Sequence, residues 1–279
     1  MKRRLVLSLT LLMLCCAACG VSGSNAGKDA AAGKDAAPGK EAAAGKAATA
    51  ENALTATVTT ELHAPIQVEE ASPEWIMNIP AAQDESVTQM VVVAAMGEDL
   101  TTATVSMHER AEDGTWKQIL TTPGFVGRTG VIPDAKRQAG TGKTPMGDYR
   151  FTQAFGIAPD PGCAMPYVQV DEDKYWSGDY TYHPNEMVSL SEHPELDTDN
   201  SEHLIEYEYE YQYCLNIGFN EEGTYGRGDA IFLHCIGRKK PYTGGCVAVP
   251  EYAMKYILQH VKPECRIVID LFENMGGSF

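Results

Sequence analysis

The residues of this chain best suited to covalent chemistry are a cysteine and a histidine near its C-terminus. Cys246 ends the run Thr243-Gly244-Gly245-Cys246 and lies twelve residues after His234 (246 − 234 = 12). The thiolate is the nucleophilic form of cysteine, and a nearby imidazole can take the thiol proton. Glycine adopts backbone angles that other residues avoid, so N–H groups of this loop can face a substrate carbonyl. The alternative is a structural cysteine, because cysteine is among the most buried residue types.

Two apolar runs predict the elements that position this pair. Residues 230–233 form a run that is typical of a strand and ends at His234, and residues 247–249 begin a second run. A loop between the two strand ends can bring His234 and Cys246 together at one rim. Cys235 adjoins His234 in the first strand, so its side chain is expected to point away from that of His234, into the core.

The rest of the pattern predicts a mainly β fold with one clear helix. Pro250 and Glu251 open that helix, directly after the cysteine loop, and Pro263 ends it. The run Glu206 to Tyr211 alternates Glu and Tyr, which predicts an exposed edge or rim strand; a substrate-facing wall is the less favoured alternative. Further strands are predicted over residues 89–95, 104–110, 116–120, 149–151, 213–219 and 266–271.

A second motif lies upstream of the cysteine loop. It reads Gly142-Lys143-Thr144-Pro145-Met146-Gly147 and is followed by Phe155-Gly156. Together, the two motifs resemble the signature of the L,D-transpeptidase catalytic domain family (YkuD-like), in which a Thr-Pro-x-Gly hairpin precedes a strand-end histidine and a [Ser/Thr]-x-Gly-Cys loop. Their order and separation also agree, and the resemblance extends from about Thr88 to Asp270.

The resemblance implies a YkuD-like β-sandwich with mixed sheets, and a reaction on peptidoglycan that needs no cofactor. Cys246 would attack the carbonyl of the third residue of a stem peptide. The terminal D-alanine would leave, protonated by His234, and an amine of a second stem would resolve the thioester to give a 3→3 cross-link. The N–H groups of Gly245 and Cys246 are expected to hold the oxyanion, Thr243 to order the loop, and a backbone carbonyl to orient His234. Carbapenem-type β-lactams would acylate the same thiol.

Two positions depart from the family pattern. Many members have a second histidine where this chain has Gly244, and an arginine where it has Ala248. That arginine is expected to position charged substrate or the loop, so its absence indicates a divergent subgroup. Arg128 and Arg238 are candidate carboxylate clamps here, with ordinary surface roles as the alternative. Rival functions are an L,D-carboxypeptidase or other hydrolase with the same pair, a non-catalytic cell-wall-binding lipoprotein, and a structural or adhesive surface protein.

The N-terminus predicts export. Basic residues at positions 2–4 precede the apolar stretch 5–14, and Ala17-Ala18-Cys19 follows. This ending resembles a bacterial lipobox, so we expect a lipidated Cys19 and an extracytoplasmic protein anchored to the membrane. Plain secretion is the alternative.

The predicted organisation has four parts: a lipoprotein signal peptide (1–19), a disordered Ala/Gly/Lys-rich tether (20–60), a lead-in segment (61–87) and the catalytic domain (88–279). The tether repeats Gly-Lys every six residues and lacks large apolar residues, so it cannot bury a core. The formal net charge of −16 argues against nucleic acid and anionic lipid surfaces as partners.

The other cysteines and histidines give weaker signals. Cys163, Cys214, Cys235 and Cys265 permit two disulfides in three pairings, or four free thiols. His183, His193 and His203 lie in a polar stretch without a recognised metal-ligand spacing, so exposed histidines and no metal are predicted.

Overall fold

The protein was studied as a computed structural model that describes residues 67–238 and 240–278. The predicted signal peptide, the tether and the start of the lead-in segment lie outside these residues. The strands are β1 Gln67–Ala71, β2 Gln89–Ala95, β3 Thr102–Arg110, β4 Trp116–Phe125, β5 Val131–Pro133, β6 Thr144–Gly156, β7 Tyr167–Gln169, β8 Lys174–Trp176, β9 Met187–Ser189, β10 Glu202–His203, β11 Cys214–Ile217, β12 Phe232–Cys235, β13 Val247–Val249 and β14 Arg266–Leu271. The α-helices are α1 Pro80–Gln83 and α2 Glu251–His260, and the 3₁₀ turns are η1 Glu74–Asn78, η2 Asp134–Lys136, η3 Thr198–Asn200, η4 Leu204–Glu206 and η5 Glu210–Gln212.

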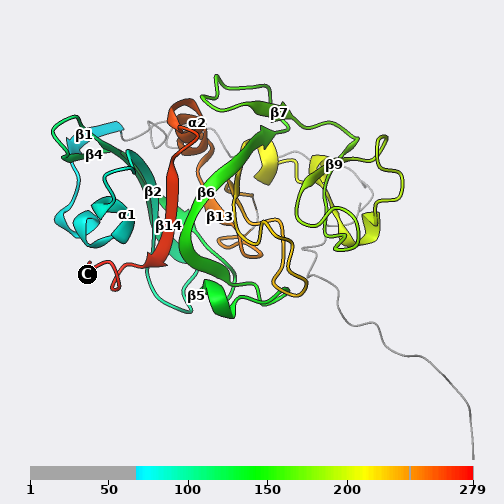
Figure 1. The fold of residues 1–279 in the computed structure, drawn as a ribbon, viewed down its shortest axis with the longest axis horizontal. Helices are drawn as coiled ribbons and strands as arrows, with labels where there is room; N and C mark the ends of the chain where they lie inside the picture. Colours follow the sequence, from blue (N-terminus) through cyan, green and yellow to red (C-terminus); the bar gives the residue numbers. More distant parts are fainter. Residues whose placement is uncertain (1–66, 239, 279) are drawn as a thin grey trace, which may run out of the picture. The chain divides into compact units, whose positions relative to one another are not determined.

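Eight strands form a closed ring of backbone pairing. Their order is β4-β13-β12-β11-β6-β14-β2-β3, and β3 pairs back with β4 (Figure 1). The β12–β13 and β14–β2 pairs are parallel, whereas the other neighbours in the ring are antiparallel. The mainly β fold with mixed pairing is therefore confirmed. Closure leaves these strands without a free edge, which makes the ring a rigid support for loops.

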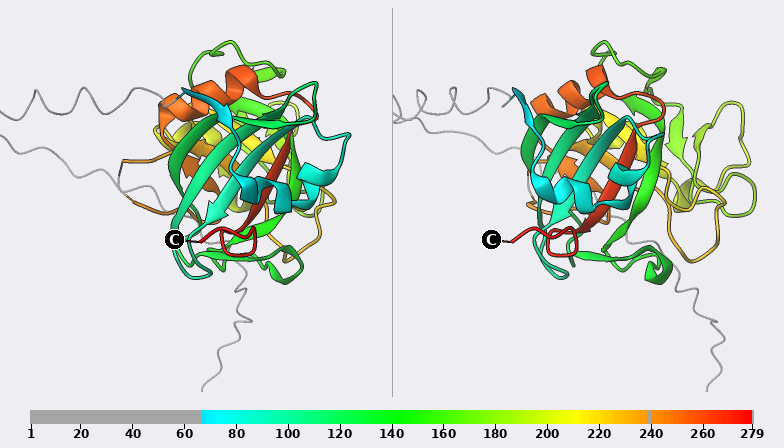
Figure 2. Two further views of the ribbon diagram at one scale, coloured as in Figure 1. Left: turned by 90° about the vertical axis from the view of Figure 1, so that its left-hand side faces the viewer. Right: turned by 60° about the vertical axis from the view of Figure 1, so that its left-hand side comes forward.

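The ring has apolar side chains on both faces, and β2 shows the pattern most clearly. Val91 and Val93 lie in the main core, whereas Met90 and Val92 lie in a second cluster with η1 and α1. Burial on both faces explains why this strand is a continuous apolar run rather than an alternating one. Helix α2 packs on the main core through Ala253, Met254, Ile257 and Leu258 (Figure 2).

A third cluster lies on the other face of β11, β12 and β6. Phe155, Cys214, Phe232 and Cys246 meet Trp176 there. The Trp176 ring lies 4.8 Å from the Phe232 ring and 5.9 Å from the Phe155 ring, centroid to centroid. Trp176 belongs to a small sheet, β10-β8-β9, within the long connection between β6 and β11. The sequence analysis did not predict this small sheet, and the connection that contains it forms one wall beside Cys246.

The predicted strand over Glu206–Tyr211 is wrong. The segment forms the η4 and η5 turns, in which Tyr207 N–H donates to Leu204 O and Tyr211 N–H to Tyr207 O. Leu204 and Tyr211 are buried at its two ends, so local turns bury the apolar groups that a flat edge strand would expose. The tyrosines still gather on one side, because the Tyr207 and Tyr211 rings stack at 4.4 Å.

Other predicted elements differ mainly in length. Strands β2 and β14 have the predicted bounds, but β4 extends to Phe125 and β6 spans thirteen residues. The five described cysteines, Cys163, Cys214, Cys235, Cys246 and Cys265, are all free thiols. None of the helices built by the described residues has the length and apolar character needed to cross a bilayer.

Candidate active site

The loop before β13 is held by two threonine hydroxyls that meet at one carbonyl. Thr243 Oγ1 donates to Cys246 O at 2.7 Å, and Thr144 Oγ1 donates to the same oxygen at 3.0 Å. Thr144 also accepts from Gly127 N–H at 2.8 Å, and it is fully buried. Thr243 therefore orders the loop, as predicted. The upstream Thr-Pro-x-Gly motif has the same task, because its threonine fixes the backbone of the cysteine.

The Cys246 thiol is buried against the strand that carries His234. Its Sγ lies 3.2 Å from Ala230 O, to which it donates, and accepts from Phe232 N–H at 3.3 Å. Ala230 has a φ of +53°, in the left-handed region that L-residues rarely occupy. Asn185 Oδ1 accepts from Ala230 N–H at 3.1 Å, and Asn185 itself has a φ of +56°. Unusual backbone therefore lies directly beside the thiol, as is common at functional sites.

Gly245 is required both by its backbone angle and by its surroundings. Its φ is +150°, and a Cβ there would lie 3.1 Å from Arg137 Nη2 and 3.2 Å from Lys143 O. The Gly245 N–H donates to Thr243 Oγ1 at 3.1 Å, so it is engaged within the loop. A role of this N–H as an oxyanion donor remains a prediction, and it would require this hydrogen bond to open. Gly244 is exposed at the mouth of the site.

His234 is oriented by a backbone carbonyl, as predicted. Its Nδ1 lies 2.8 Å from Cys235 O, so Nδ1 carries the proton and Nε2 is the basic nitrogen. Burial lowers the pKa of the His234 imidazole below its ordinary value of 6.5, against a smaller opposite effect of the Cys235 carbonyl and Glu210. The side chain is therefore neutral at pH 7 and can act as a base.

His234 and Cys246 face the same side of the sheet. His234 pairs with Ala248 on the neighbouring parallel strand, and Cys246 lies two residues before Ala248. Because side chains alternate along a strand, Cys246 and Ala248 share one face, while Val247 and Val249 enter the main core. Cys235 points into that core as well, as predicted, and is 1 % exposed.

A cleft of about 460 Å³ opens over both residues. Its lining includes Cys246, His234, Gly244, Ala248, Arg128, Arg238, Tyr207–Tyr211, Arg137 and Asp229. Arg128 donates to Gly140 O at 3.3 Å, and the Arg238 guanidinium lies 3.9 Å from the centroid of the Tyr209 ring. The cleft therefore contains a cysteine thiol, a neutral imidazole and three arginines, groups that are suited to nucleophilic chemistry on an anionic substrate.

Comparison with known families agrees with this geometry. Residues 101–269 match the model of the YkuD L,D-transpeptidase catalytic domain, which covers more than half of the chain. The chain belongs to the L,D-transpeptidase catalytic domain family. Members of this family act on peptidoglycan stem peptides outside the cytoplasm. The two motifs of the family thus meet at the carbonyl of Cys246.

Other comparisons add little. Among curated proteins no significant match is found. The crystal structure of the helical cell shape determining protein Pgp2 from Campylobacter jejuni is similar with a TM-score of 0.35 and 14% identity, over 71% of this chain and 55% of that one. This chain thus spans about half the length of that structure, and so weak a likeness carries no argument about function.

Several groups around this L,D-transpeptidase-type site gave no signal in the sequence. Tyr211 is buried beside His234, with 5.6 Å between the ring centroids, and Asp229 takes a hydrogen bond from Tyr180 at 2.9 Å. Arg137 is 5 % exposed although arginine is rarely buried. All three come from turns and loops, where no periodicity indicates which side chains turn inward.

The histidines in the polar stretch are half-buried rather than exposed. His183 Nδ1 lies 2.8 Å from Glu186 Oε1. The hydrogen bond with Glu186 raises the pKa of the His183 imidazole more than desolvation lowers it. Side-chain ligand atoms of His183, His193 and Glu195 lie within 4.8 Å of one another. His203 stacks instead on Tyr175, at 4.3 Å between centroids. These histidines and Glu195 lie outside the cleft lining.

The double role of Thr144 leads to a first prediction. Thr144→Val keeps the shape but leaves the buried Gly127 N–H without its acceptor, which costs about 1–3 kcal/mol and lowers Tm by several degrees in a domain of this size. Turnover should fall as well, since the Cys246 carbonyl loses one donor. Calorimetry and product assays measure both effects.

Thr122→Val is the matched control, because Thr122 is also buried but accepts no backbone N–H from the described residues. Equal changes in the two variants would contradict the special role of Thr144.

Proposed function

We propose that this protein is a peptidoglycan L,D-transpeptidase that uses Cys246 as nucleophile and His234 as general base and acid. The observation that carries the proposal is the shared cleft of the two residues, with the His234 Nδ1–H held by Cys235 O. That hydrogen bond leaves the basic Nε2 for the reaction, because Nδ1 already carries a proton.

The first half of the reaction forms a thioester. The Cys246 proton leaves its hydrogen bond to Ala230 O and passes to His234 Nε2 as Sγ attacks the carbonyl of the third stem residue. The tetrahedral intermediate carries negative charge on oxygen, and the Cys246 N–H is the proposed donor to it. When the intermediate collapses, His234 Nε2–H protonates the departing amine of the terminal residue.

The second half resolves the thioester. An amine of a second stem attacks the thioester carbon, His234 takes the amine proton, and the sulfur leaves and is reprotonated. The product is a 3→3 cross-link. Water in place of the amine gives a shortened stem instead, and this L,D-carboxypeptidase reaction is the second candidate function. The exposed position of Gly244 at the cleft mouth supports transfer, because a bulky acceptor needs an open approach to the thioester.

A product assay separates these possibilities. The soluble domain is incubated with a disaccharide-tetrapeptide, with and without an acceptor stem, and the products are identified by mass. A cross-linked dimer establishes transfer, whereas a tripeptide alone in the presence of acceptor establishes hydrolysis. An intact stem together with a Cys246 that does not react with small thiol reagents would favour a non-catalytic cell-wall-binding protein.

The anchor predicted from Ala17-Ala18-Cys19 is a second part of the proposal. A lipidated Cys19 followed by a polar tether would place the enzyme at the membrane surface with reach into the cell wall. Cys19→Ser should move the protein from the membrane to the soluble fraction or stop its maturation. Membrane retention of this variant, with no lipid found on the wild-type N-terminal peptide, would contradict the anchor.

A further inference from the structure

The catalytic cleft contains one guanidinium that is buried beside the nucleophile loop. Arg137 follows η2, lines the cleft and is 5 % exposed. Its Nη2 lies 3.1 Å from the position that a Cβ on Gly245 would occupy, so the cation touches the turn that carries Cys246. A Cβ at position 245 would therefore press on this guanidinium.

Few polar contacts of this guanidinium offset the free-energy cost of burying its charge. Among the described residues, the one hydrogen bond of the guanidinium runs from Nη1 to Arg227 O at 3.4 Å, and Nε has no partner there. No carboxylate of the described residues lies within 4.0 Å of it. Burial lowers the pKa of Arg137, but an arginine stays protonated in proteins. A buried cation without a paired anion is costly, which indicates that an anion completes the site.

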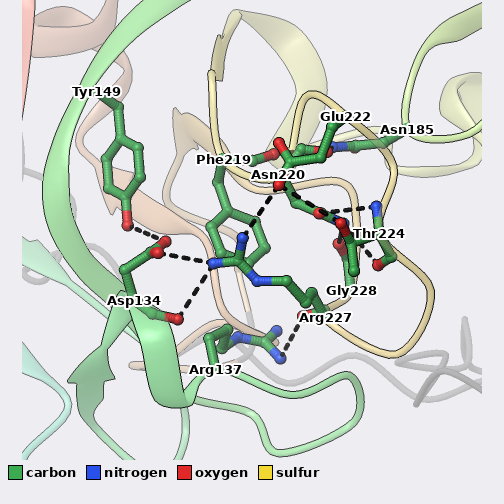
Figure 3. Close-up of polar contacts among 10 residues, drawn as sticks. All are labelled: Asp134, Arg137, Tyr149, Asn185, Phe219, Asn220, Glu222, Thr224, Arg227 and Gly228. Carbon is green, nitrogen blue, oxygen red and sulfur yellow. Dashed lines mark hydrogen bonds and ion pairs between the residues drawn. The ribbon is translucent and has the colours of Figure 1, made fainter.

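The neighbouring Arg227 shows how the protein treats a structural arginine. Arg227 forms ion pairs with Asp134 at 2.7 Å and Glu222 at 3.4 Å, and Tyr149 donates to the same Asp134. The Phe219 ring lies under both guanidinium groups, at 5.0 Å from Arg227 and 6.0 Å from Arg137 (Figure 3). Two similar cations thus share one ring, and only the one outside the cleft lining has carboxylate partners.

Asp229, the carboxylate in the cleft that acts on Arg137, already has another hydrogen-bond partner. Asp229 Oδ2 accepts from the Tyr180 hydroxyl at 2.9 Å, and burial raises the pKa of the Asp229 carboxyl despite the attraction of Arg137. Cys246, Asp229 and Tyr180 in their ionised forms would attract Arg137, Cys246 most strongly, whereas Arg128 repels it. With the Cys246 thiol donating to Ala230 O and Asp229 bonded to Tyr180, Arg137 has no ion-pair partner among the described residues before substrate binds.

We propose that Arg137 binds the free α-carboxylate of the residue that leaves when Cys246 attacks, an inference that rests on the proposed function. That carboxylate is attached to the carbon next to the scissile nitrogen, so in the reactive complex it must lie within a few ångströms of Cys246. A planar guanidinium can bind it by donating two parallel hydrogen bonds to its oxygens. Arg137 then selects stems that end at the leaving residue.

The position of Ala248 supports this assignment. Ala248 lines the same cleft and pairs with His234, at the place where many relatives are expected to have an arginine. In this chain a cation reaches the cleft from Arg137, the residue that follows η2. The backbone N–H of Arg137 donates to the backbone carbonyl of Asp134 at 3.0 Å, and the Asp134 carboxylate pairs with Arg227, so these contacts fix the main chain that carries Arg137.

The test combines a change in the enzyme with a change in the substrate. A tetrapeptide stem and the same stem with a C-terminal amide are compared in wild type, Arg137→Met and Arg137→Lys, with Arg128→Met and Arg238→Met as matched cleft controls. Wild type should prefer the acid by about 10- to 100-fold in kcat/KM. Arg137→Met should lose this preference by losing rate on the acid only, Arg137→Lys should keep part of it, and the two controls should keep it fully.

Three results would overturn the inference. The first is equal rates of wild type on acid and amide, a comparison that requires no variant to fold. The second is an equal loss on both substrates in Arg137→Met together with slower alkylation of Cys246 by iodoacetamide, which would assign the arginine to the thiol. The third is loss of the preference for the acid in Arg128→Met or Arg238→Met instead of in Arg137→Met. Failure of the proposed function looks different, because wild type would then convert neither stem.

Discussion

Cys246→Ala should abolish conversion of stem peptides and leave the fold intact. Alanine cannot form a thioester, and the Thr243 and Thr144 hydroxyls can still donate to the backbone carbonyl at position 246. Turnover should therefore fall to the background of the assay. Carbapenem-type β-lactams should add one covalent adduct to wild type and none to the variant, as intact mass and peptide mapping would show.

The other cysteines serve as internal controls for this prediction. Burial raises the pKa of the Cys235 thiol to about 12 and that of the Cys214 thiol well above its ordinary value, so both are poor nucleophiles. Cys235→Ala should keep the adduct and the turnover per folded molecule. Mapping of the adduct to Cys163, Cys214 or Cys235 would show that the nucleophile is assigned wrongly here.

His234→Ala should slow acylation by about 10²–10⁴-fold, the usual contribution of a general acid–base group. Single-turnover acylation with the tetrapeptide measures this step directly. In wild type, burial lowers the pKa of His234, so the neutral, proton-accepting form persists to lower pH than for a free imidazole. The acidic limb of kcat/KM against pH should therefore lie below pH 6.5 and should be lost in the variant.

His108 provides a matched control for the loss of a buried histidine. It lies between Ser106 and Ser72 at 2.7 and 2.8 Å, outside the cleft lining, and burial lowers its pKa to about 4. His108→Gln should reduce thermal stability but not the acylation rate of the folded protein. An acylation defect as large as that of His234→Ala would mean that the rate reports folding rather than proton transfer.

The sequence predicts those parts of the fold in which periodicity and side-chain type agree. The apolar run of β2, the β14 run and the helix between Pro250 and Pro263 are found as predicted, because both sides of the ring bury their side chains and prolines limit the helix. The Glu206–Tyr211 alternation misled, since two short turns can expose every second residue as a strand does. The alternation of residue types does not distinguish a strand from two short turns. The turns differ from a strand in the burial of Leu204 and Tyr211, which the sequence pattern does not show.

The candidate site was predictable where the chain keeps its groups close together. His234 and the cysteine loop lie on consecutive strands, and the Cys235 carbonyl that orients the imidazole is in the next residue. Arg137 and Tyr211 were not predictable, because each comes from a turn far from Cys246 in sequence. Their placement depends on the packing around Phe219 and Phe232, and no local signal encodes such contacts.

The closed ring of strands also bears on how the enzyme reaches its active form. The strand that follows the nucleophile, β13, is three residues long and is held between β12 and a residue of β4 that lies 123 positions earlier in the chain (Ala248 and Phe125, 248 − 125 = 123). Thr144 must likewise reach the carbonyl of Cys246, which lies 102 positions later in the chain. Pairing at such separation is slow, because the entropy of loop closure is lost before the contacts form. We therefore expect the thiol to gain its surroundings late in folding, after the C-terminal third of the chain has closed the ring.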